Sequence, residues 1–255
     1  MTDLVLVERP SDRVAHVVLN RPERRNALTG PLADQMGEAL ETLNADDDVS
    51  VLVIRGSGGA FCSGLDLKEF SKDPQPDWVP EFGGKWRRVH AALFDSPKIV
   101  IGALERAAVN GGGALALACD FLICGDKSFL QVGEIQQGMA APMNMAWLTL
   151  RFPESVIARI ALVGDRIAGP ELVRLGVAFE SVADDGVVDA AQGLAERLAA
   201  HDPGGVARIK VSMRRNGLAA SAAAAEGTAA AWFAAALASD PAPQAVTRPK
   251  AATDS

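Results

Sequence analysis

The feature that most constrains the fold is a run of three glycines between an apolar strand pattern and an apolar helix pattern. Gly111, Gly112 and Gly113 lead directly into residues 114–118, which are all alanine or leucine. A helix that begins on glycine presents bare backbone N–H groups at its positive end, where a ligand oxygen can approach closely. Glycines at this place equally serve close packing of a helix against a strand. The run therefore predicts a strand–turn–helix unit whose turn binds a ligand or allows close packing.

A second turn of small residues, 60–66, follows the apolar run 51–54. Short continuous apolar runs are typical of buried strands in α/β layers, so the strand–turn–helix unit occurs at least twice. Function usually gathers at the carboxyl ends of such strands. Two turns of this kind could supply the two N–H donors of an oxyanion hole, which stabilises negative charge on a carbonyl oxygen.

The wider pattern predicts an α/β fold whose last third is helical. Strand patterns occupy 4–8, 14–19, 51–54, 99–104 and 121–124, with the first two joined as a hairpin, and helix patterns occupy 32–43 and 86–93. Residues 71–84 contain three prolines and two glycines, which predicts an irregular, mobile flap. From about Pro170 onward we expect almost only helix, followed by a loose tail after residue 240; the helical segments are 172–175, 187–200, 206–216 and the alanine-rich 219–239.

Composition and charge exclude several classes of function. The net charge of −7 argues against a nucleic-acid binder, because few cations are left over to neutralise phosphates. The three cysteines lie in apolar surroundings and predict no disulfide framework, which favours the cytoplasm. No apolar run is long enough to span a membrane, and the N-terminal residues do not resemble a signal peptide. The histidines are dispersed, so we expect no metal site.

Glu134 is the strongest candidate for a proton carrier. An oxyanion hole that holds an enolate suits a thioester with an acidic α-carbon, and such a reaction also needs one group that moves the proton. Glu134 lies in the mostly small and apolar stretch 132–143, with no basic residue nearby. Burial among apolar groups raises the pKa of a carboxyl toward neutrality. The alternative is a solvated or helix-capping glutamate.

The other polar candidates favour structural roles. Asp66 precedes a short helical pattern and is expected to be its N-cap, and Asp120 is expected to satisfy backbone groups beside a buried helix. His90 lies on a helix as a packed or surface histidine. Cys62 and Ser63 are candidate nucleophiles, but no histidine follows them at a suitable place, so we expect no covalent catalysis.

Several motifs, in order along the chain, resemble the crotonase, or enoyl-CoA hydratase/isomerase, superfamily. They are the segments 20–28, 60–67, 111–120, 162–167 and 175–178. The resemblance implies a spiral core of ββα units over residues 1–195 and a helical region for trimer contacts over 196–255. It also implies acyl-CoA substrates, a homotrimer or hexamer, and oxyanion-hole amides on Leu65 and Gly111.

One departure from the family pattern bears on the reaction. Family hydratases use two glutamates; the first falls on Ala114, which cannot carry a proton, and the second falls on Glu134. A single glutamate suits moving a proton between two carbons of an acyl chain. The pattern therefore looks like the branch of 3-enoyl to 2-enoyl-CoA isomerases, which also resembles this chain in Gly-Leu-Asp-Leu at 64–67 and in Ala-Pro at 141–142.

Two alternatives remain open. One is an enoyl-CoA hydratase in which Glu134 works alone or with Glu105 or Glu81. The other is a protein that binds acyl-CoA without turnover, which the missing first glutamate and the altered residues 104–107 motivate. Asn110 also stands where a first glycine is common in the family.

The sequence implies no cofactor apart from coenzyme A, which enters as part of the substrate. Arg24 and Arg25 either hold the CoA phosphates or are solvated. Met143, Met145 and Trp147 either line an apolar acyl pocket or belong to a helix core. By resemblance, the residues that cradle the adenine and pantetheine are Ala27, Leu65, Asp66 and Leu67.

Overall fold

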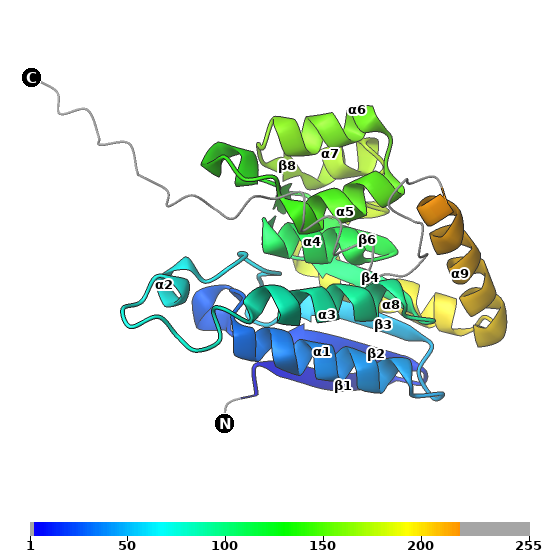
Figure 1. The fold of residues 1–255 in the computed structure, drawn as a ribbon. Helices are drawn as coiled ribbons and strands as arrows, with labels where there is room; N and C mark the ends of the chain where they lie inside the picture. Colours follow the sequence, from blue (N-terminus) through cyan, green and yellow to red (C-terminus); the bar gives the residue numbers. More distant parts are fainter. Residues whose placement is uncertain (1–2, 220–255) are drawn as a thin grey trace, which may run out of the picture.

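The main layer of the protein is a six-stranded sheet with the order β1-β2-β3-β4-β6-β9 (Figure 1). The structure is a computed structural model that describes residues 3–219, with side chains to residue 214. β1 runs antiparallel to β2, and every other neighbouring pair in this sheet is parallel. Its strands are β1 (Val5–Ser11), β2 (Val14–Leu19), β3 (Val51–Gly56), β4 (Ile99–Leu104), β6 (Phe121–Gly125) and β9 (Glu180–Val182).

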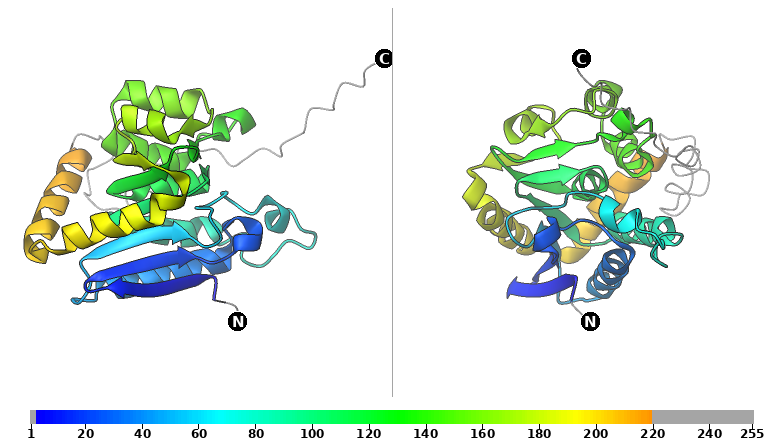
Figure 2. Two further views of the ribbon diagram at one scale, coloured as in Figure 1. Left: turned by 180° about the vertical axis from the view of Figure 1, so that it is seen from behind. Right: turned by 90° about the vertical axis from the view of Figure 1, so that its left-hand side faces the viewer.

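Helices cover both faces of this sheet (Figures 1 and 2). α1 (Gly30–Asn44), with α3 (Phe82–Phe94) beside it, covers one face, and α8 (Val187–Ala199) covers the other. Successive side chains of a strand point to opposite faces. Leu52 and Ile54 of β3 therefore join the core on the α1 side, while Val51 and Val53 pack under α8. Burial on both faces explains why the run 51–54 is apolar without alternation.

The remaining elements are a second, smaller sheet and further helices and turns (Figure 1). A second sheet, ordered β5-β7-β8, consists of β5 (Ala107–Val109), β7 (Phe129–Gln131) and β8 (Ile167–Ala168). The other helices are α2 (Leu67–Phe70), α4 (Gly111–Ala118), α5 (Pro142–Arg151), α6 (Glu154–Ile157), α7 (Gly169–Arg174) and α9 (Pro203–Ala219). Single turns of 3₁₀ or π type are η1 (Pro22–Arg24), η2 (Glu134–Gln137), η3 (Ala158–Leu162) and η4 (Asp184–Gly186).

The predicted α/β core is confirmed. All five predicted strands form, and β1 and β2 pair as a hairpin with Val5 opposite Leu19. The predicted helix 32–43 is α1, which begins after Thr29; the side-chain oxygen of Thr29 accepts a hydrogen bond from the N–H of Leu32 at 3.4 Å. This contact satisfies one of the unpaired N–H groups at the start of the helix.

Two expectations need correction, and three short strands were missed. The chain is not almost wholly helical after Pro170, because β9 forms an edge strand beside β6. The short strands β5, β7 and β8 were not predicted, since two or three residues are too few to show a period of two. The irregular segment between α2 and α3 is residues 71–81, shorter than predicted, and its mobility stays a prediction.

The helical C-terminal part is only partly described. α8 and α9 cover the predicted helices 187–200 and 206–216, and α8 continues across residue 195, so the division into two regions stays a prediction. The helix predicted at 219–239, apart from its first residue, and the tail after residue 240 lie outside the described residues.

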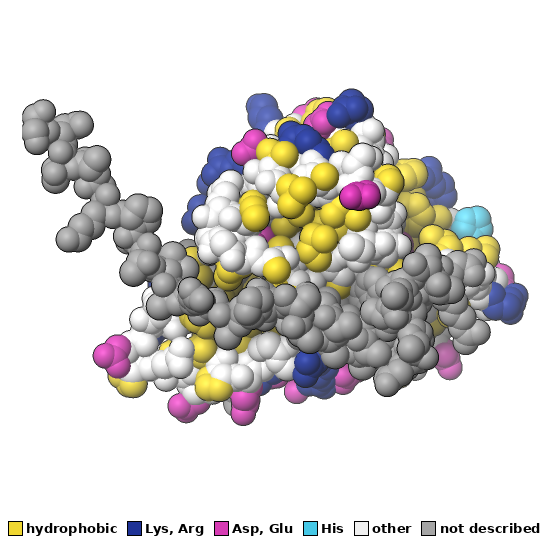
Figure 3. Space-filling view, turned by 45° about the horizontal axis from the view of Figure 1, so that its top comes forward, with side chains coloured by type: hydrophobic (Ala, Val, Ile, Leu, Met, Phe, Trp, Pro, Cys, Tyr) yellow, Lys and Arg dark blue, Asp and Glu magenta, His cyan; other side chains and the backbone are white. Residues whose placement is uncertain are grey.

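Exposed apolar side chains gather at the end of the molecule that carries η3 and α7. They include Leu162, Val163 and Val173, and Figure 3, which views this end, shows hydrophobic atoms at the surface. None of the described helices is long and apolar enough to cross a membrane. Within residues 3–219, no three His, Cys, Asp or Glu side chains are grouped as metal ligands.

Candidate active site

The two glycine turns of the sequence lie side by side. The N–H of Cys62 donates to the C=O of Ala107 at 3.0 Å, and the N–H of Val109 donates to the C=O of Cys62 at 3.1 Å. A Cβ atom on Gly112 would lie 2.4 Å from the carbonyl oxygen of Cys62. One on Gly64, whose φ is +86°, would lie 2.7 Å from the carbonyl oxygen of Val109. The glycines therefore do serve close packing, which brings the two turns together.

The same packing leaves two backbone donors without acceptors among the described residues. The residues on either side of Leu65 pair with Leu28 through backbone hydrogen bonds of 2.8 and 2.9 Å. The N–H of Leu65 therefore points away from Leu28. Gly111 is the first residue of α4, and the first N–H groups of a helix have no intrahelical partner. Within residues 3–219, no group accepts a hydrogen bond from either N–H.

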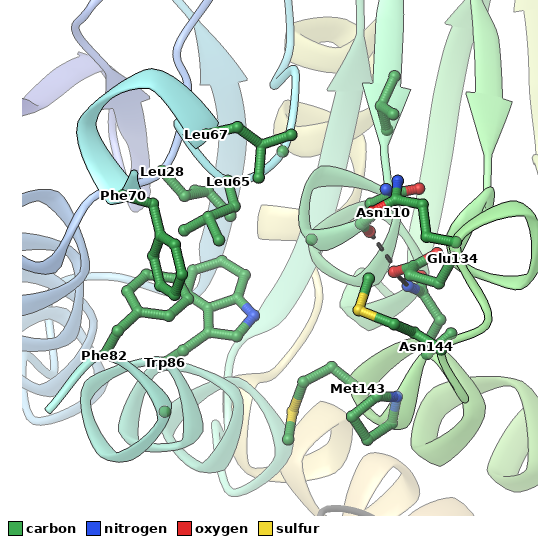
Figure 4. Close-up of a pocket in the computed structure, with 18 of the residues that line it drawn as sticks. Leu28, Leu65, Leu67, Phe70, Phe82, Trp86, Asn110, Glu134, Met143 and Asn144 are labelled. Atoms are coloured by element: carbon green, nitrogen blue, oxygen red, sulfur yellow. Dashed lines mark hydrogen bonds between the residues drawn. The ribbon is translucent and has the colours of Figure 1, made fainter. Parts of the chain in front are cut away.

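Both turns border a cavity of about 570 Å³. Figure 4 shows its two walls: the apolar side chains of Leu67, Phe70, Phe82 and Trp86 on one side, and Asn110, Glu134 and Asn144 on the other. The rings of Phe82 and Trp86 are stacked, with centroids 6.2 Å apart and planes inclined by 10°. The cavity therefore offers an apolar surface that faces a small group of polar atoms, as ligand sites usually do.

Glu134 is buried in the polar wall. Its side chain lies at the start of η2 and is 8% exposed. One carboxylate oxygen, Oε1, accepts a hydrogen bond from Asn144 Nδ2 at 2.8 Å, and Oε2 has no partner within the described residues. Burial raises the pKa of Glu134 to about 7, although the hydrogen bonds from its own backbone and from Asn144 oppose the rise. Glu134 is therefore not a solvated glutamate, and it exchanges protons readily near neutral pH.

Asp66 is the helix cap that the sequence predicted. Its carboxylate accepts a hydrogen bond from the N–H of Glu69 at 3.2 Å, at the start of α2. Ion pairs join it to Arg21 at 3.1 Å and to Arg24 at 2.8 Å. Burial opposes the charge, but the hydrogen bonds from Arg24, from the Glu69 N–H and from Arg21 together lower the pKa of Asp66.

The expected CoA-binding residues lie in different environments. Arg24 already pairs with Asp66, whereas Arg25 is exposed and has no side-chain partner within the described residues. Ala27 is buried at 6% exposure and does not line the cavity. Leu65 and Leu67 do line it, and Leu67 is 61% exposed at its rim.

The helix residues proposed for an acyl pocket divide between cavity and core. Met143 lines the cavity, but Met145 does not. Trp147 is fully buried, and its indole N–H donates to Nδ1 of His90 at 2.8 Å. Burial lowers the pKa of His90 to about 3, so this packed histidine stays neutral.

Of the remaining candidates for acid–base or covalent chemistry, only Ser63 borders the cavity. Burial raises the pKa of the Cys62 thiol to about 12, and the hydroxyl of Ser63 donates to the C=O of Arg24. Glu105 does not line the cavity, and Glu81 is an exposed residue that pairs with Lys85. Asp120 satisfies the N–H of Val100, as predicted, and also binds two cations of α9, Lys210 and Arg214.

Sequence reasoning gave no role to Asn144, although it contacts Glu134. Asn144 is 1% exposed, on a helix segment whose other residues from 142 to 148 are apolar. A lone amide in such a segment needs a hydrogen-bond partner, because burying it unpaired is costly. That signal was available in the sequence, but the identity of the partner was not.

Comparisons with known proteins agree on one family. The family described as enoyl-CoA hydratase/isomerase matches residues 9–239. The chain is 32% identical over 199 residues to carnitinyl-CoA dehydratase of Proteus mirabilis. The aligned region covers 77% of this chain and 75% of that protein.

Solved structures show the same fold. A probable enoyl-CoA hydratase/isomerase from Mycobacterium abscessus superposes with a TM-score of 0.75 at 29% identity, covering 86% of this chain and 84% of that one. A monofunctional enoyl-CoA isomerase from M. smegmatis superposes with a TM-score of 0.70 at 27% identity, covering 87% of this chain and 97% of that one.

Proposed function

Because the chain belongs to the enoyl-CoA hydratase/isomerase family, we propose that it converts 3-enoyl-CoA to trans-2-enoyl-CoA thioesters. One observation carries this choice of reaction: Glu134 is the only titratable side chain among the described residues that line the cavity. Moving a double bond requires one proton carrier, because the proton that leaves one carbon returns to another. Adding water requires a group that activates the water as well, and Ala114 is a buried methyl group where the family hydratases have a glutamate.

In the proposed reaction, the thioester carbonyl oxygen accepts hydrogen bonds from the N–H groups of Leu65 and Gly111. Glu134 Oε2 removes a proton from C2, and the electron pair of that C–H bond forms the C1–C2 double bond of an enolate. The protonated carboxyl then delivers the proton to C4, where the electron pair of the C3–C4 double bond forms the new C–H bond; the C1–C2 pair moves to C2–C3, and the enolate oxygen re-forms the carbonyl. Removal of one oxyanion donor costs roughly 3 kcal/mol of transition-state stabilisation.

The environment of Glu134 supports this role. A pKa of about 7 leaves the carboxylate and the carboxylic acid both accessible near neutral pH, and the step uses one form and then the other. Since Oε1 is held by Asn144, Oε2 both takes and returns the proton. The proton therefore leaves and re-enters on the same face of the acyl chain.

We propose that CoA lies along the Leu65–Leu67 backbone. The exposed Arg25 is available to bind its phosphates, whereas Arg24 is already paired with Asp66. No further cofactor takes part. We also propose the homotrimer or hexamer that the resemblance implies; the exposed apolar residues around η3 and α7 support contacts between subunits.

Two substrates offered in parallel test the reaction. With 3-hexenoyl-CoA we expect 2-hexenoyl-CoA, followed by the absorbance of the conjugated enoyl thioester. With 2-hexenoyl-CoA we expect no 3-hydroxyhexanoyl-CoA by mass spectrometry. Hydration without migration of the double bond would contradict the isomerase proposal and favour a hydratase, an alternative suggested by the name of the Proteus mirabilis relative.

The variant Glu134→Gln separates catalysis from binding. We expect kcat to fall by about a hundredfold or more, because the amide cannot accept the C2 proton, while binding of the substrate persists. The exposed Glu81→Gln is the matched control and should keep full activity. Equal activity in Glu134→Gln and the parent would contradict the proposal, and binding of acyl-CoA without any turnover would favour a binding protein.

A further inference from the structure

Asn110 connects the two halves of the proposed site through its backbone and its side chain. It immediately precedes Gly111 and has an unusual backbone conformation, with φ of 50° and ψ of −110°. Its N–H donates to the C=O of Gln131 at 2.8 Å, and its Oδ1 accepts a hydrogen bond from the N–H of Gly133 at 2.9 Å. Asn110 therefore binds the segment that leads into Glu134 at two points.

Asn144 makes a second connection from the opposite direction. Its Nδ2 donates to the C=O of Asn110 at 3.1 Å and to Glu134 Oε1 at 2.8 Å. These two acceptors determine which way the amide faces, since the reversed amide would place Oδ1 against both of them. The absence of a side chain on Gly113 makes room, because a Cβ there would lie 3.2 Å from Asn144 Oδ1.

The two asparagines thus form one clamp, defined here as the side chains of Asn110 and Asn144 together with their three hydrogen-bond partners, the N–H of Gly133, the C=O of Asn110 and the carboxylate of Glu134. One face of the clamp holds the peptide before Gly111, whose N–H is a proposed oxyanion donor. The other face holds the Glu134 carboxylate and the N–H of Gly133, the residue before it. The spacing between base and donor is therefore set by side-chain hydrogen bonds as well as by the backbone fold.

No other charge in the described residues competes with the clamp for Glu134. Burial and hydrogen bonds account for the shift of its pKa, with no contribution from another charged group. Three charged or titratable side chains on the surrounding elements bind other groups: Lys85 pairs with Asp34, His90 with Trp147 and Arg151 with the C=O of Leu117. Three more do not line the cavity, namely Lys68, Glu69 and Arg159.

We propose that Asn110 and Asn144 are positioning residues, which hold Glu134 Oε2 at a fixed place relative to the N–H of Gly111. The proposal rests on the proposed function of Glu134 and Gly111. Asn144 also favours the charged carboxylate, because a hydrogen bond to an ionised group stabilises that form.

The variant Asn144→Leu removes the amide and keeps a side chain of similar size. We expect kcat for 3-hexenoyl-CoA to fall by about a hundredfold with KM changed by about threefold or less, because a misplaced base impairs the chemical step more than binding. The midpoint of the pH profile of kcat/KM should rise by about one pH unit. Asn110→Gly keeps the freedom of φ but removes Oδ1, and should lower kcat without a comparable shift of the midpoint.

Leu148→Ala is the matched control, because Leu148 is fully buried on the same helix and does not line the cavity. It should lower the melting temperature and leave the pH midpoint unchanged. A midpoint for Asn144→Leu equal to that of the parent, with a rate loss no larger than in Leu148→Ala, would overturn the clamp. If Asn144→Leu does not fold, a kcat for Asn110→Gly equal to that of the parent overturns it instead.

The outcome for Glu134→Gln distinguishes the two proposals. If Glu134→Gln keeps full activity, the proposed function fails. If it loses activity while Asn110→Gly and Asn144→Leu match the parent in kcat and pH midpoint, only the clamp fails.

Discussion

Replacing the proposed catalytic base should stabilise the protein at alkaline pH. In the folded protein the pKa of Glu134 is about 7, against 4.5 for an ordinary glutamate. Between these two values the unfolded chain is ionised while the folded chain keeps its proton, so stability falls as the pH rises. The difference of about 2.5 pH units corresponds to about 3 kcal/mol, at 1.36 kcal/mol per unit.

Glu134→Gln removes this dependence, because the amide does not ionise. At pH 4.5 and below, the parent and the variant should have similar free energies of unfolding. Above pH 7 the variant should be more stable by about 3 kcal/mol. The measurement is urea unfolding at pH 5 and pH 8.5, extrapolated linearly to water at one fixed protein concentration.

The exposed variant Glu81→Gln is the control and should show no such difference between the two pH values. If the stability of Glu134→Gln relative to the parent is the same at pH 5 and pH 8.5, the reasoning is refuted. A variant that is less stable at pH 8.5 would refute it as well. The expected result would mean that the protein carries an unfavourable buried carboxyl because its reaction needs one.

Other consequences follow from charge and packing. The activity of the parent on 3-hexenoyl-CoA should rise with pH through a midpoint near 7 in kcat/KM, because only the ionised Glu134 accepts the C2 proton; a profile that is flat from pH 5 to 9 would contradict this. Asp120→Asn should lower the free energy of unfolding by about 3–5 kcal/mol, since it leaves Lys210 and Arg214 buried without their anion. Glu41→Gln breaks an exposed ion pair and should lower it by about 1 kcal/mol or less. Equal losses of stability in thermal melts of the two variants would contradict this reasoning. Gly112→Ala should abolish activity and destabilise the fold, because its Cβ would lie 2.4 Å from the carbonyl oxygen of Cys62. Gly193→Ala in α8 is the control: its Cβ would have no atom within 4 Å, so the stability should stay the same or rise.

The short contacts around the glycine turns confirm one of two interpretations of the sequence and leave the other as a prediction. The run 111–113 predicted either close packing or a turn that binds a ligand; the close packing is confirmed, and ligand binding stays a prediction. Gly112 lies against Cys62 with no room for a side chain, and that packing places the Gly111 N–H at the cavity without an acceptor in the described residues. The proposed ligand contact would therefore use other atoms of the turn than those that pack against Cys62.

Much of the fold could be predicted from the sequence because burial leaves a local record. The apolar run 51–54 is a strand buried on both faces, and α1 shows its helical period and its threonine cap. The crotonase-type α/β fold that the motifs implied is confirmed by the solved structures of the family. The strands β5, β7, β8 and β9 could not be predicted, because their pairing partners lie far away in the chain and the strands themselves are two or three residues long.

The sequence by itself determined the candidate base and the two turns, since residue type and order suffice for these, and its resemblance to the family pointed to the alanine at position 114. Only the tertiary structure decided that Glu134 is buried, that Asn144 holds one of its oxygens, and that Arg24 is occupied by Asp66 while Arg25 is exposed. The physical reason is that solvation and hydrogen bonding depend on groups brought together from distant parts of the chain. A pKa of about 7 for Glu134 arises from that surrounding burial, which no local stretch of residues specifies.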